Sequence, residues 1–378
     1  MPRKQKCLVV YVGTGEGFKA PAVAIAKELE AQGVECRTVD FLPGLGLDKA
    51  DSLSKEIWRR LFWQHSSAFS LGFKVAESSL FLNISKQVIY HLLRKQAIRQ
   101  IREEKPDFIF STFFVATSFY ARLGKELGIP VFGYNSEVLF CPPILVCNDV
   151  ARFFVSSREG YEDMVKKGQE KELIRLTGFP LDSKFRKKYG SIALERKKLG
   201  LANKFTVLLV YGGEGYGPVL PLIDQMSEFR ADIQLVIVCG RNQKMFDALN
   251  RNKPDHLVVK GFIDNLQDYI YCADIAAGKS GLNYTFESIF LRKPILVLRA
   301  MQNETYAAKM IVNKKIGWWP KDTEEAMGII RKAMRDRDYL KAYQDRLKNI
   351  PVMFSSTDIA DSLLSEMKCR AMKKPKQV

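Results

Sequence analysis

Two glycine-rich segments in the second half of the chain have residue types that can bind phosphate. Gly212–Gly217 follows the apolar run Thr206–Tyr211, and Gly278-Lys-Ser-Gly281 precedes a predicted helix. Glycines allow the backbone to approach a phosphate closely, and the helix behind such a turn presents unpaired N–H groups and the positive end of its dipole. The first turn alone is equally well explained as an ordinary connection between a strand and a helix, whereas the second loop could hold a diphosphate.

Two further features of this half could bind a nucleoside. Glu287 lies inside the helix after the second turn, where a carboxylate can accept hydrogen bonds from both hydroxyls of a ribose. Standing alone, it is more often a solvated helix residue. Gly261-Phe-Ile-Asp-Asn265 reads as a strand end entering a helix capped by Asp264, and backbone groups at such strand ends commonly line ligand crevices in open α/β sheets.

The elements that must position these residues alternate between short β-rich runs and helical stretches, which predicts an α/β fold with mainly parallel sheets. In the first half we expect one long helical region at 52–104, helices at 20–32 and 115–127, and strands at 7–12, 34–41, 107–112, 130–134 and 152–155. In the second half we expect helices at 265–272 and 284–290 and strands at 206–211, 234–239, 257–260 and 294–298.

This pattern divides the chain into two domains of ordinary size. We predict a first domain at 1–177, a linker at 178–204, a second domain at 205–350, and a C-terminal helix with a basic tail at 351–378. The first and second domains are both expected to be Rossmann-like. The last helix is expected to pack back on the first domain.

Taken in order, these motifs resemble glycosyltransferase family 28, in particular its monogalactosyldiacylglycerol synthases and bacterial processive diacylglycerol glucosyltransferases. The resemblance covers most of the chain. It is carried by Gly178-Phe-Pro180, Val207–Pro218, Val238-Cys-Gly-Arg-Asn242, Gly261–Asn265 and Lys279-Ser-Gly…Glu287. It implies the GT-B architecture, in which two Rossmann-like domains face each other, with the nucleotide in the C-terminal domain.

The resemblance also implies roles for single residues. The uracil would rest on backbone near Ile263, Glu287 would bind the ribose, and the two glycine-rich loops would hold the diphosphate. Positive charge for the leaving diphosphate would come from Arg241 and Lys279. The nucleotide-sugar residues predicted in this way are Gly212, Gly213, Gly215, Gly240, Arg241, Ile263, Lys279, Ser280, Gly281, Glu287 and Gln302.

The chain departs from the family pattern at the residues expected near the donor sugar. The family has a Gly-Gln-Glu element there, and this chain has Met301-Gln-Asn303 followed by Glu304. Gln302 therefore matches, while Asn303 replaces the acid. Tyr284 replaces the family's Thr before the helix. These departures leave the identity of the sugar open.

A third glycine-rich turn, in the first half, is expected on the acceptor side. The family reads roughly Thr-Gly-Gly-Gly-His there, and this chain reads Thr14-Gly-Glu-Gly-Phe18. Phenylalanine cannot move a proton, and an inverting transfer needs a base near the attacking hydroxyl. Glu16 and Glu137 are the candidate bases, although each is also explained as a solvated or capping carboxylate. The acceptor-side loop comprises Gly13, Thr14, Gly15, Gly17 and Phe18.

The formal net charge of +17 predicts an anionic partner, either a membrane surface or nucleic acid. Aromatic residues stand beside basic ones within 52–104, which suits an interfacial helix on an anionic bilayer, although the aromatics could equally face the core. No nucleic-acid-binding motif is recognisable, so nucleic acid is not expected as a partner. The predicted membrane-contacting residues are Trp58, Arg59, Arg60, Phe62 and Trp63.

Together with the motifs, the family resemblance implies an inverting glycosyltransferase that moves a hexose from a UDP-sugar to a diacylglycerol-like lipid. No cofactor is expected, and no DxD-type or His/Asp cluster indicates a metal. Without a secretory segment or an apolar run of roughly 18–20 residues, the protein is expected in the cytoplasm, peripherally associated with the membrane. The histidine missing at Phe18 leaves a second hypothesis open, a non-catalytic protein that binds nucleotide or lipid on the same fold.

Overall fold

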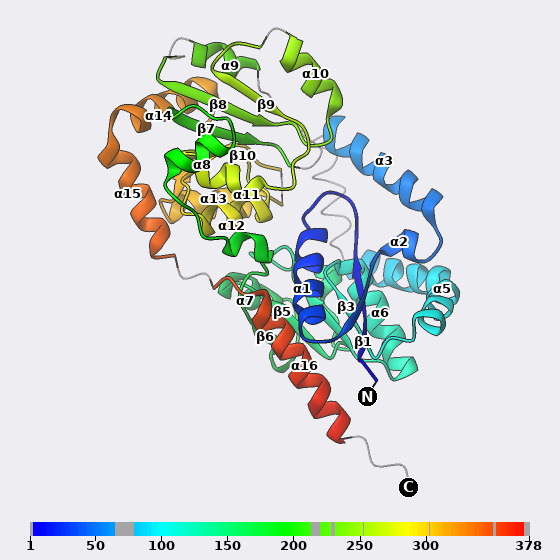
Figure 1. Cartoon of the computed structure of the whole chain (residues 1–378). Coiled ribbons are helices and arrows are strands. Elements are labelled where there is room, and N and C mark those ends of the chain that lie inside the picture. The colour runs from blue at the N-terminus through cyan, green and yellow to red at the C-terminus, as the bar shows by residue number, and fades with distance from the viewer. Residues whose placement is uncertain are drawn as a thin grey trace. The chain divides into compact units, whose positions relative to one another are not determined.

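The computed structural model describes residues 3–64, 79–212, 220–227, 231–251, 253–301, 303–350 and 353–373, without the side chains of 58–64, 79–83, 371 and 373. The chain forms two compact units (Figure 1). Unit 1 comprises Met1–Asp182 and Val352–Val378, and unit 2 comprises Ser183–Pro351.

In the described part of unit 1, six parallel strands form a sheet in the order β2-β1-β3-β4-β5-β6. The strands are β1 (Lys6–Tyr11), β2 (Glu35–Asp40), β3 (Phe108–Ser111), β4 (Val131–Tyr134), β5 (Arg152–Val155) and β6 (Ile174–Leu176). The central strands are mostly apolar, since a parallel sheet is covered on both faces. Leu8 and Ile109 belong to one core cluster and Val9 and Phe110 to another, so successive side chains supply the two faces.

The helices of unit 1 cover both faces of this sheet. They are α1 (Lys19–Ala31), α2 (Phe41–Gly44), α3 (Asp48–Gln64), α5 (Ser79–Glu104), α6 (Phe114–Leu127), α7 (Arg158–Lys166) and α16 (Ser356–Lys373). The last helix packs beside α1, as expected, because Ile359 and Leu363 are fully buried in the same cluster as Ile25. The C-terminal segment therefore completes the core of the first unit.

In the described part of unit 2, a second sheet of six parallel strands has the order β12-β11-β10-β7-β8-β9. Its strands are β7 (Phe205–Val210), β8 (Ile233–Val238), β9 (Leu257–Lys260), β10 (Ile275–Lys279), β11 (Ile295–Arg299) and β12 (Gly317–Trp318). Its helices are α8 (Ile192–Lys198), α9 (Leu220–Met226), α10 (Gln243–Arg251), α11 (Leu266–Cys272), α12 (Leu282–Phe290), α13 (Thr305–Asn313), α14 (Thr323–Arg335) and α15 (Arg337–Lys348). The α/β class with mainly parallel sheets is thus confirmed.

The structure differs from the sequence prediction at several boundaries. The region 52–104 contains α3 and α5 as separate helices, with residues 65–78 outside the described part. The two units meet at Asp182, and α8 lies inside the segment predicted as a linker. One residue of the basic run around α8 forms a buried ion pair: Arg196 is buried, and its Nη2 atom lies 2.7 Å from Asp274 Oδ2.

Short or irregular elements account for the other differences. Strands β6 and β12 have three and two residues, too few for a periodic pattern. Strand β10 continues through Lys279, so Gly278 and Lys279 end a strand instead of forming a loop. Helix α11 begins after Asn265, so Asp264 is not its N-cap. None of the described helices is long and apolar enough to cross a membrane.

Candidate functional site

In both units the predicted loops follow the two strands where the strand order reverses. In unit 1, β1 has β2 on one side and β3 on the other; in unit 2, β7 has β8 on one side and β10 on the other. Ligands of open α/β sheets bind at this point, beyond the carboxyl ends of the strands. The turn at Gly13 follows β1, and the segments at Gly212 and Ser280 follow β7 and β10.

The end of β10 in unit 2 carries a partly buried ion pair. Lys279 Nζ lies 2.9 Å from Glu304 Oε1, and the other carboxylate oxygen of Glu304 accepts a hydrogen bond from the backbone N–H of Met301. Ser280 Oγ donates to the backbone oxygen of Glu304 at 3.0 Å. Glu304 itself is only 5% exposed. Glu304, which the sequence places beside the family's donor-sugar element, therefore organises the loop after β10.

Backbone geometry brings the two predicted diphosphate loops of unit 2 together. Gly278 has a φ of 146°, and a Cβ atom there would lie 1.9 Å from the backbone oxygen of Val210, so only glycine fits. Gly212 is also close to the other loop, since a Cβ atom on it would lie 2.8 Å from Lys279 Cε. The start of the first turn and the Lys279 side chain are thus in contact.

Helix α12 begins directly behind this loop. Its N-cap residue is Gly281, which has no side chain to cap the first turn. The N-terminal N–H groups of a helix attract anions, so the loop has the local structure of a phosphate site. Glu287 lies half-buried within the same helix, one and a half turns further on.

Tyr284, where the family has Thr, is a core residue of α12. It is buried, and its hydroxyl donates to the backbone oxygen of Leu208 at 3.3 Å. Burial and then the negative charge of Glu287 raise the pKa of Tyr284 well above its usual value. Tyr284 therefore stays neutral and fastens α12 to β7. Nearby, Asn303 Oδ1 is inaccessible to solvent and has no hydrogen-bond partner among the described residues.

The segments after β8 and β9 add a cation and an aromatic ring, respectively. The guanidinium carbon of Arg241 lies 4.4 Å from the ring centroid of Phe262, whose side chain is half exposed. Phe262 stands in the Gly261–Asn265 motif directly before Ile263, yet the sequence did not single it out. The signal available in the sequence was an aromatic residue within a motif that ends a strand. Gly213, Gly215 and Gln302 lie outside the described residues, and their roles stay predictions.

The acceptor-side turn of unit 1 is held by a carboxylate and a lysine that the sequence did not single out as a pair. Asp40 Oδ1 accepts a hydrogen bond from the backbone N–H of Gly13 at 3.1 Å. Lys55 Nζ, from α3, lies 2.9 Å from Asp40 Oδ2 and 2.6 Å from Asp51 Oδ2. Burial disfavours the charged form of Lys55, but hydrogen bonds to Asp51 and Asp40 outweigh it and raise its pKa. This network ties α3 to the Gly13 turn.

Phe18 lies in an aromatic cluster at the ends of β1 and β3. Its ring meets those of Phe113 and Phe114 edge-on, with centroids 5.4 and 5.6 Å away. The hydroxyl of Thr112 donates to the backbone oxygen of Phe18 at 2.7 Å. The position where the family carries a histidine is therefore apolar in this chain, and its backbone is fixed to the neighbouring strand.

The two candidate bases occupy turns at the same edge of the unit 1 sheet. Glu16 is half-buried between Gly15 and Gly17, and its backbone oxygen accepts a hydrogen bond from Ala20 N at 3.0 Å. Glu137 is half-buried after β4, where its backbone N–H donates to Asn135 Oδ1. Their catalytic roles stay predictions.

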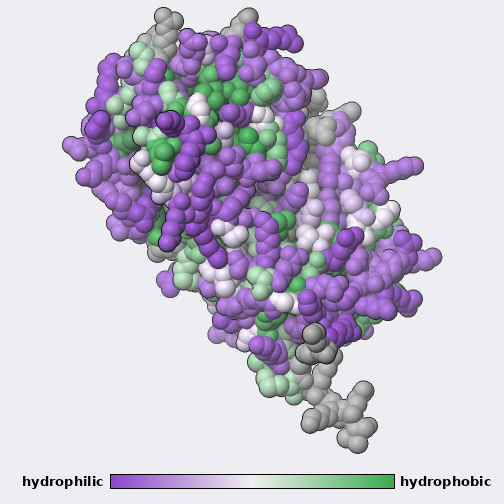
Figure 2. All heavy atoms as spheres, in the orientation of Figure 1, coloured by the Kyte–Doolittle hydropathy of each residue, from purple (hydrophilic) through white to green (hydrophobic). Residues whose placement is uncertain are grey.

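The side chains of the predicted membrane residues, Trp58, Arg59, Arg60, Phe62 and Trp63, lie outside what the structure describes. The described surface nearby carries aliphatic side chains. Ile84, Val88 and Leu92 on α5 are 55%, 49% and 66% exposed, and their spacing of four places them on one helix face. Leu53 and Ile57 on α3 are exposed in the same way. Figure 2 shows hydrophilic side chains over most of the visible face.

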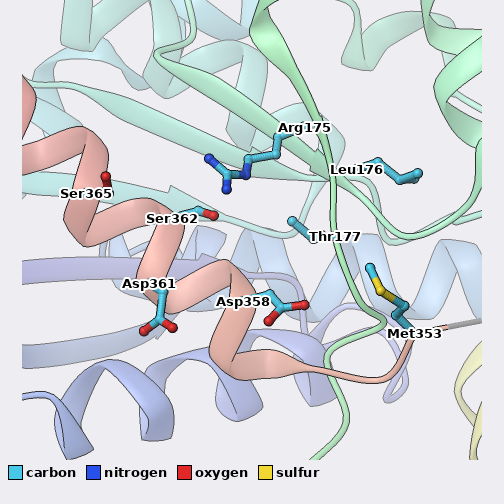
Figure 3. A pocket seen from close by; sticks show the side chains of 8 residues that line it. All are labelled: Arg175, Leu176, Thr177, Met353, Asp358, Asp361, Ser362 and Ser365. Carbon is cyan, nitrogen blue, oxygen red and sulfur yellow. The ribbon is translucent and has the colours of Figure 1, made fainter.

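A groove of about 470 Å³ in unit 1 lies between β6 and α16 (Figure 3). Arg175 in β6 and Thr177 directly after it line one side, and Asp358, Asp361 and Ser362 line the other from the helix. None of the residues predicted for a functional site lines it.

Within the described part of the chain, no three His, Cys, Asp or Glu side chains form a group that could hold a metal ion, and metal independence stays a prediction.

Comparisons with known proteins agree with the motifs. Residues 49–181 match the family described as monogalactosyldiacylglycerol (MGDG) synthase. The chain is 24% identical to a processive diacylglycerol beta-glucosyltransferase of Bacillus cereus (strain AH187), over 97% of this chain and 95% of that protein.

Solved structures share the fold. The glycotransferase of kitacinnamycin has a TM-score of 0.62 at 13% identity, covering 97% of this chain and 100% of that one. The S. aureus MnaA–UDP co-structure has a TM-score of 0.60 at 12% identity, covering 100% of both chains. The chain therefore has the GT-B fold and is similar over nearly its whole length to proteins named processive diacylglycerol beta-glucosyltransferase.

Proposed function

We propose that this protein moves a hexose, with inversion, from a UDP-sugar to a diacylglycerol-like lipid at the cytoplasmic membrane surface. The observation that carries the proposal is the phosphate-type site after β10. There the Lys279–Glu304 pair, the Gly212 turn and the uncapped start of α12 meet at the point where the strand order reverses.

The donor would be held entirely by unit 2. The diphosphate would accept hydrogen bonds from the N–H groups of Gly281 and the first turn of α12. Ser280 would position this loop from within, because its N–H and its hydroxyl already donate to Arg299 and Glu304. Lys279 keeps two ammonium hydrogens beyond the one directed at Glu304, so it can serve both the carboxylate and an anion. Glu287 would bind the ribose, and Ile263 would support the uracil. A protein of the same fold has been solved with UDP.

The acceptor would be presented by unit 1. The aromatic cluster around Phe18 forms an apolar wall beside the Gly13 turn, and the exposed stripe on α5 suits contact with lipid. The similar proteins named processive diacylglycerol beta-glucosyltransferase match this chain over nearly its whole length, and they support the same substrate class.

The proposed reaction is a single displacement. A carboxylate, Glu16 or Glu137, accepts the proton of the acceptor hydroxyl, whose oxygen attacks the anomeric carbon of the sugar. The bond from that carbon to the diphosphate oxygen breaks, and UDP leaves with both electrons. Lys279, Arg241 and the N–H groups of α12 would stabilise the charge that develops on the diphosphate. Attack from the face opposite the leaving group inverts the anomeric configuration.

The test combines purified full-length protein with diacylglycerol-containing vesicles and a panel of UDP-hexoses. Mass spectrometry detects the glycolipid, and the proton coupling at its anomeric carbon reports the configuration. Glu287→Ala should abolish the thermal stabilisation by UDP, which for wild type at a hundredfold excess over Kd is about 2.7 kcal/mol. Glu324→Ala, on the exposed face of α14, is the matched control and should leave it intact. Unchanged stabilisation in Glu287→Ala contradicts the donor site.

One observation favours a second function, a non-catalytic protein that binds nucleotide or lipid. Phe18 fills the family's histidine position with an apolar ring packed against two others. Under this alternative, the protein would bind UDP tightly but would neither glycosylate lipid nor hydrolyse any donor of the panel. This alternative would be dismissed if the wild-type protein glycosylates lipid and either Glu16→Gln or Glu137→Gln abolishes that activity.

A further inference from the structure

Unit 2 has a second groove, of about 600 Å³, that contains none of the residues predicted to bind nucleotide. It lies at β12, the edge strand of the sheet, and is bordered by α14 and α15. Six of its lining residues carry the argument: Val312, Lys315, Trp318, Trp319, Tyr343 and Arg346. Its volume is that of a site for a small organic group.

The floor of the groove is aromatic and internally satisfied. Trp318 is buried, and its ring centroid lies 4.2 Å from that of Tyr343. The indole N–H of Trp318 donates to the hydroxyl of Tyr339 at 2.7 Å. These contacts explain Trp318 as a packing residue that fixes α15 to the sheet edge.

Packing within the protein does not explain Trp319 in the same way. It follows Trp318 directly at the end of β12, and its side chain is 40% exposed. Val312, at the end of α13, is 43% exposed beside it in the same groove. A tryptophan that packs only partly against its own protein presents a large apolar surface with one polar N–H, which suits a boundary between lipid and water.

Two cations stand at this groove without a carboxylate partner among the described residues. Lys315 and Arg346 are both exposed, and Arg346 Nη1 donates only to the backbone oxygen of Lys315, at 3.4 Å. The guanidinium of Arg346 lies 5.2 Å from the ring centroid of Tyr343. The one acid among the lining residues, Glu325, accepts a hydrogen bond from the backbone N–H of Lys321 at 2.9 Å. The groove thus favours an anion.

We propose that this groove is a membrane-docking site that binds the phosphate-bearing headgroup of an anionic lipid. Lys315 and Arg346 hold the phosphate, while Trp319 and Val312 enter the interfacial layer beside it. Aromatic side chains next to basic ones bind anionic bilayers through apolar area and charge together, and the net charge of +17 supports the same partner. The proposal concerns binding by unit 2 alone and requires nothing of the transfer reaction.

The experiment measures co-sedimentation of the full chain with phosphatidylcholine vesicles, with and without phosphatidylglycerol, in the absence of a sugar donor. Lys315→Glu should weaken binding to the anionic vesicles about tenfold or more, since each basic residue near the surface contributes about 1 kcal/mol. Trp319→Ser should weaken it as well, and it should also remove the share of tryptophan quenching by brominated anionic lipid that comes from Trp319, seen as the difference between this variant and wild type. Lys244→Glu is the matched control, because it makes the same charge change on α10, which packs against β9 at the other edge of the sheet.

Three results would overturn the proposal. Equal weakening by Lys244→Glu and Lys315→Glu would mean that net charge alone drives binding. Stabilisation by inorganic phosphate without vesicle binding would assign the groove to a soluble anion. A dimer lost in Trp319→Ser, with vesicle binding unchanged, would assign it to a second copy of the chain. Each variant should keep the wild-type melting temperature and the shift of that temperature with UDP. A loss of vesicle binding can therefore be told apart from a loss of the proposed donor site.

Discussion

The carboxyl ends of the two sheets have the same topology but opposite chemistry. In unit 2 the loop after β10 presents a lysine paired with Glu304 and the uncapped start of α12. In unit 1 the turns after β1 and β3 present the rings of Phe18 and Phe113, and the nearby Asp40 is already bound to Lys55 and a backbone N–H.

This difference shows how one architecture can serve two ligands. The reversal of strand order supplies a crevice in both units, and the side chains that follow the strands decide what the crevice binds. Unit 2 leaves donors available for an anion. In unit 1 the carboxylate of Asp40 is already bound, and the rings of Phe18 and Phe113 make the neighbouring turns apolar, which fits the proposed division between a nucleotide and a lipid.

The largest effect is expected where backbone approach defines the unit 2 site. Gly278→Ala puts a Cβ atom 1.9 Å from the backbone oxygen of Val210, so β10 cannot keep its place beside β7. We expect a loss of more than about 4 kcal/mol in the free energy of unfolding, measured by denaturant titration. Gly17→Ala, in the unit 1 turn, has open space around its Cβ position and should cost far less. Similar losses at both positions would contradict the contrast in backbone packing.

The second largest effect separates the structural from the ligand-binding role of Lys279. Lys279→Met leaves the carboxylate of Glu304 buried without its cation, at a cost of about 2 kcal/mol after allowance for the partial exposure of the lysine. Adding Glu304→Gln should restore most of that stability but not UDP binding, measured by calorimetry. A double variant that binds UDP as wild type does would remove Lys279 from the donor site.

A pH effect of similar size is expected at the amino ends of the unit 2 strands, opposite the donor site. Burial lowers the pKa of Lys293 from 10.5 to about 8, with Asp274 opposing the shift. Between pH 8 and 10.5 the unfolded chain therefore holds a proton that the folded chain has lost, so stability should rise with pH by up to about 3 kcal/mol. Denaturation of wild type and Lys293→Met across this range measures it. If the free energy of unfolding rises equally with pH in both proteins, Lys293 is not the group responsible.

The smallest effect is expected at Phe18. Phe18→Leu keeps an apolar side chain against Phe113, so stability should fall by only about 1 kcal/mol and kcat should change little. Glu16→Gln or Glu137→Gln should reduce kcat by about 100-fold or more if that residue is the base. A large fall in kcat for Phe18→Leu, with KM unchanged, would give the aromatic cluster a direct part in the reaction.

Much of the fold could be predicted because its signals are local. The apolar runs that became β5 and β9 have the predicted bounds, and the glycine turns stand at strand ends as expected. The errors lie where local pattern is weak: β6 and β12 are too short to show a period, and the segment containing α8 looked like a linker because its buried Arg196 resembles a surface cation.

The candidate site could be predicted as a set of loops but not as a set of contacts. The sequence alone determined that glycine-rich turns follow strands in both halves, because turn chemistry depends on neighbouring residues. Only the tertiary structure paired Lys279 with Glu304, 25 residues away, and joined Thr112 to the Phe18 backbone across 94 residues. Such partners depend on which strands lie side by side. In each unit, the order of the strands therefore decides which side chains meet at their carboxyl ends, and hence whether the crevice suits an anion or is apolar.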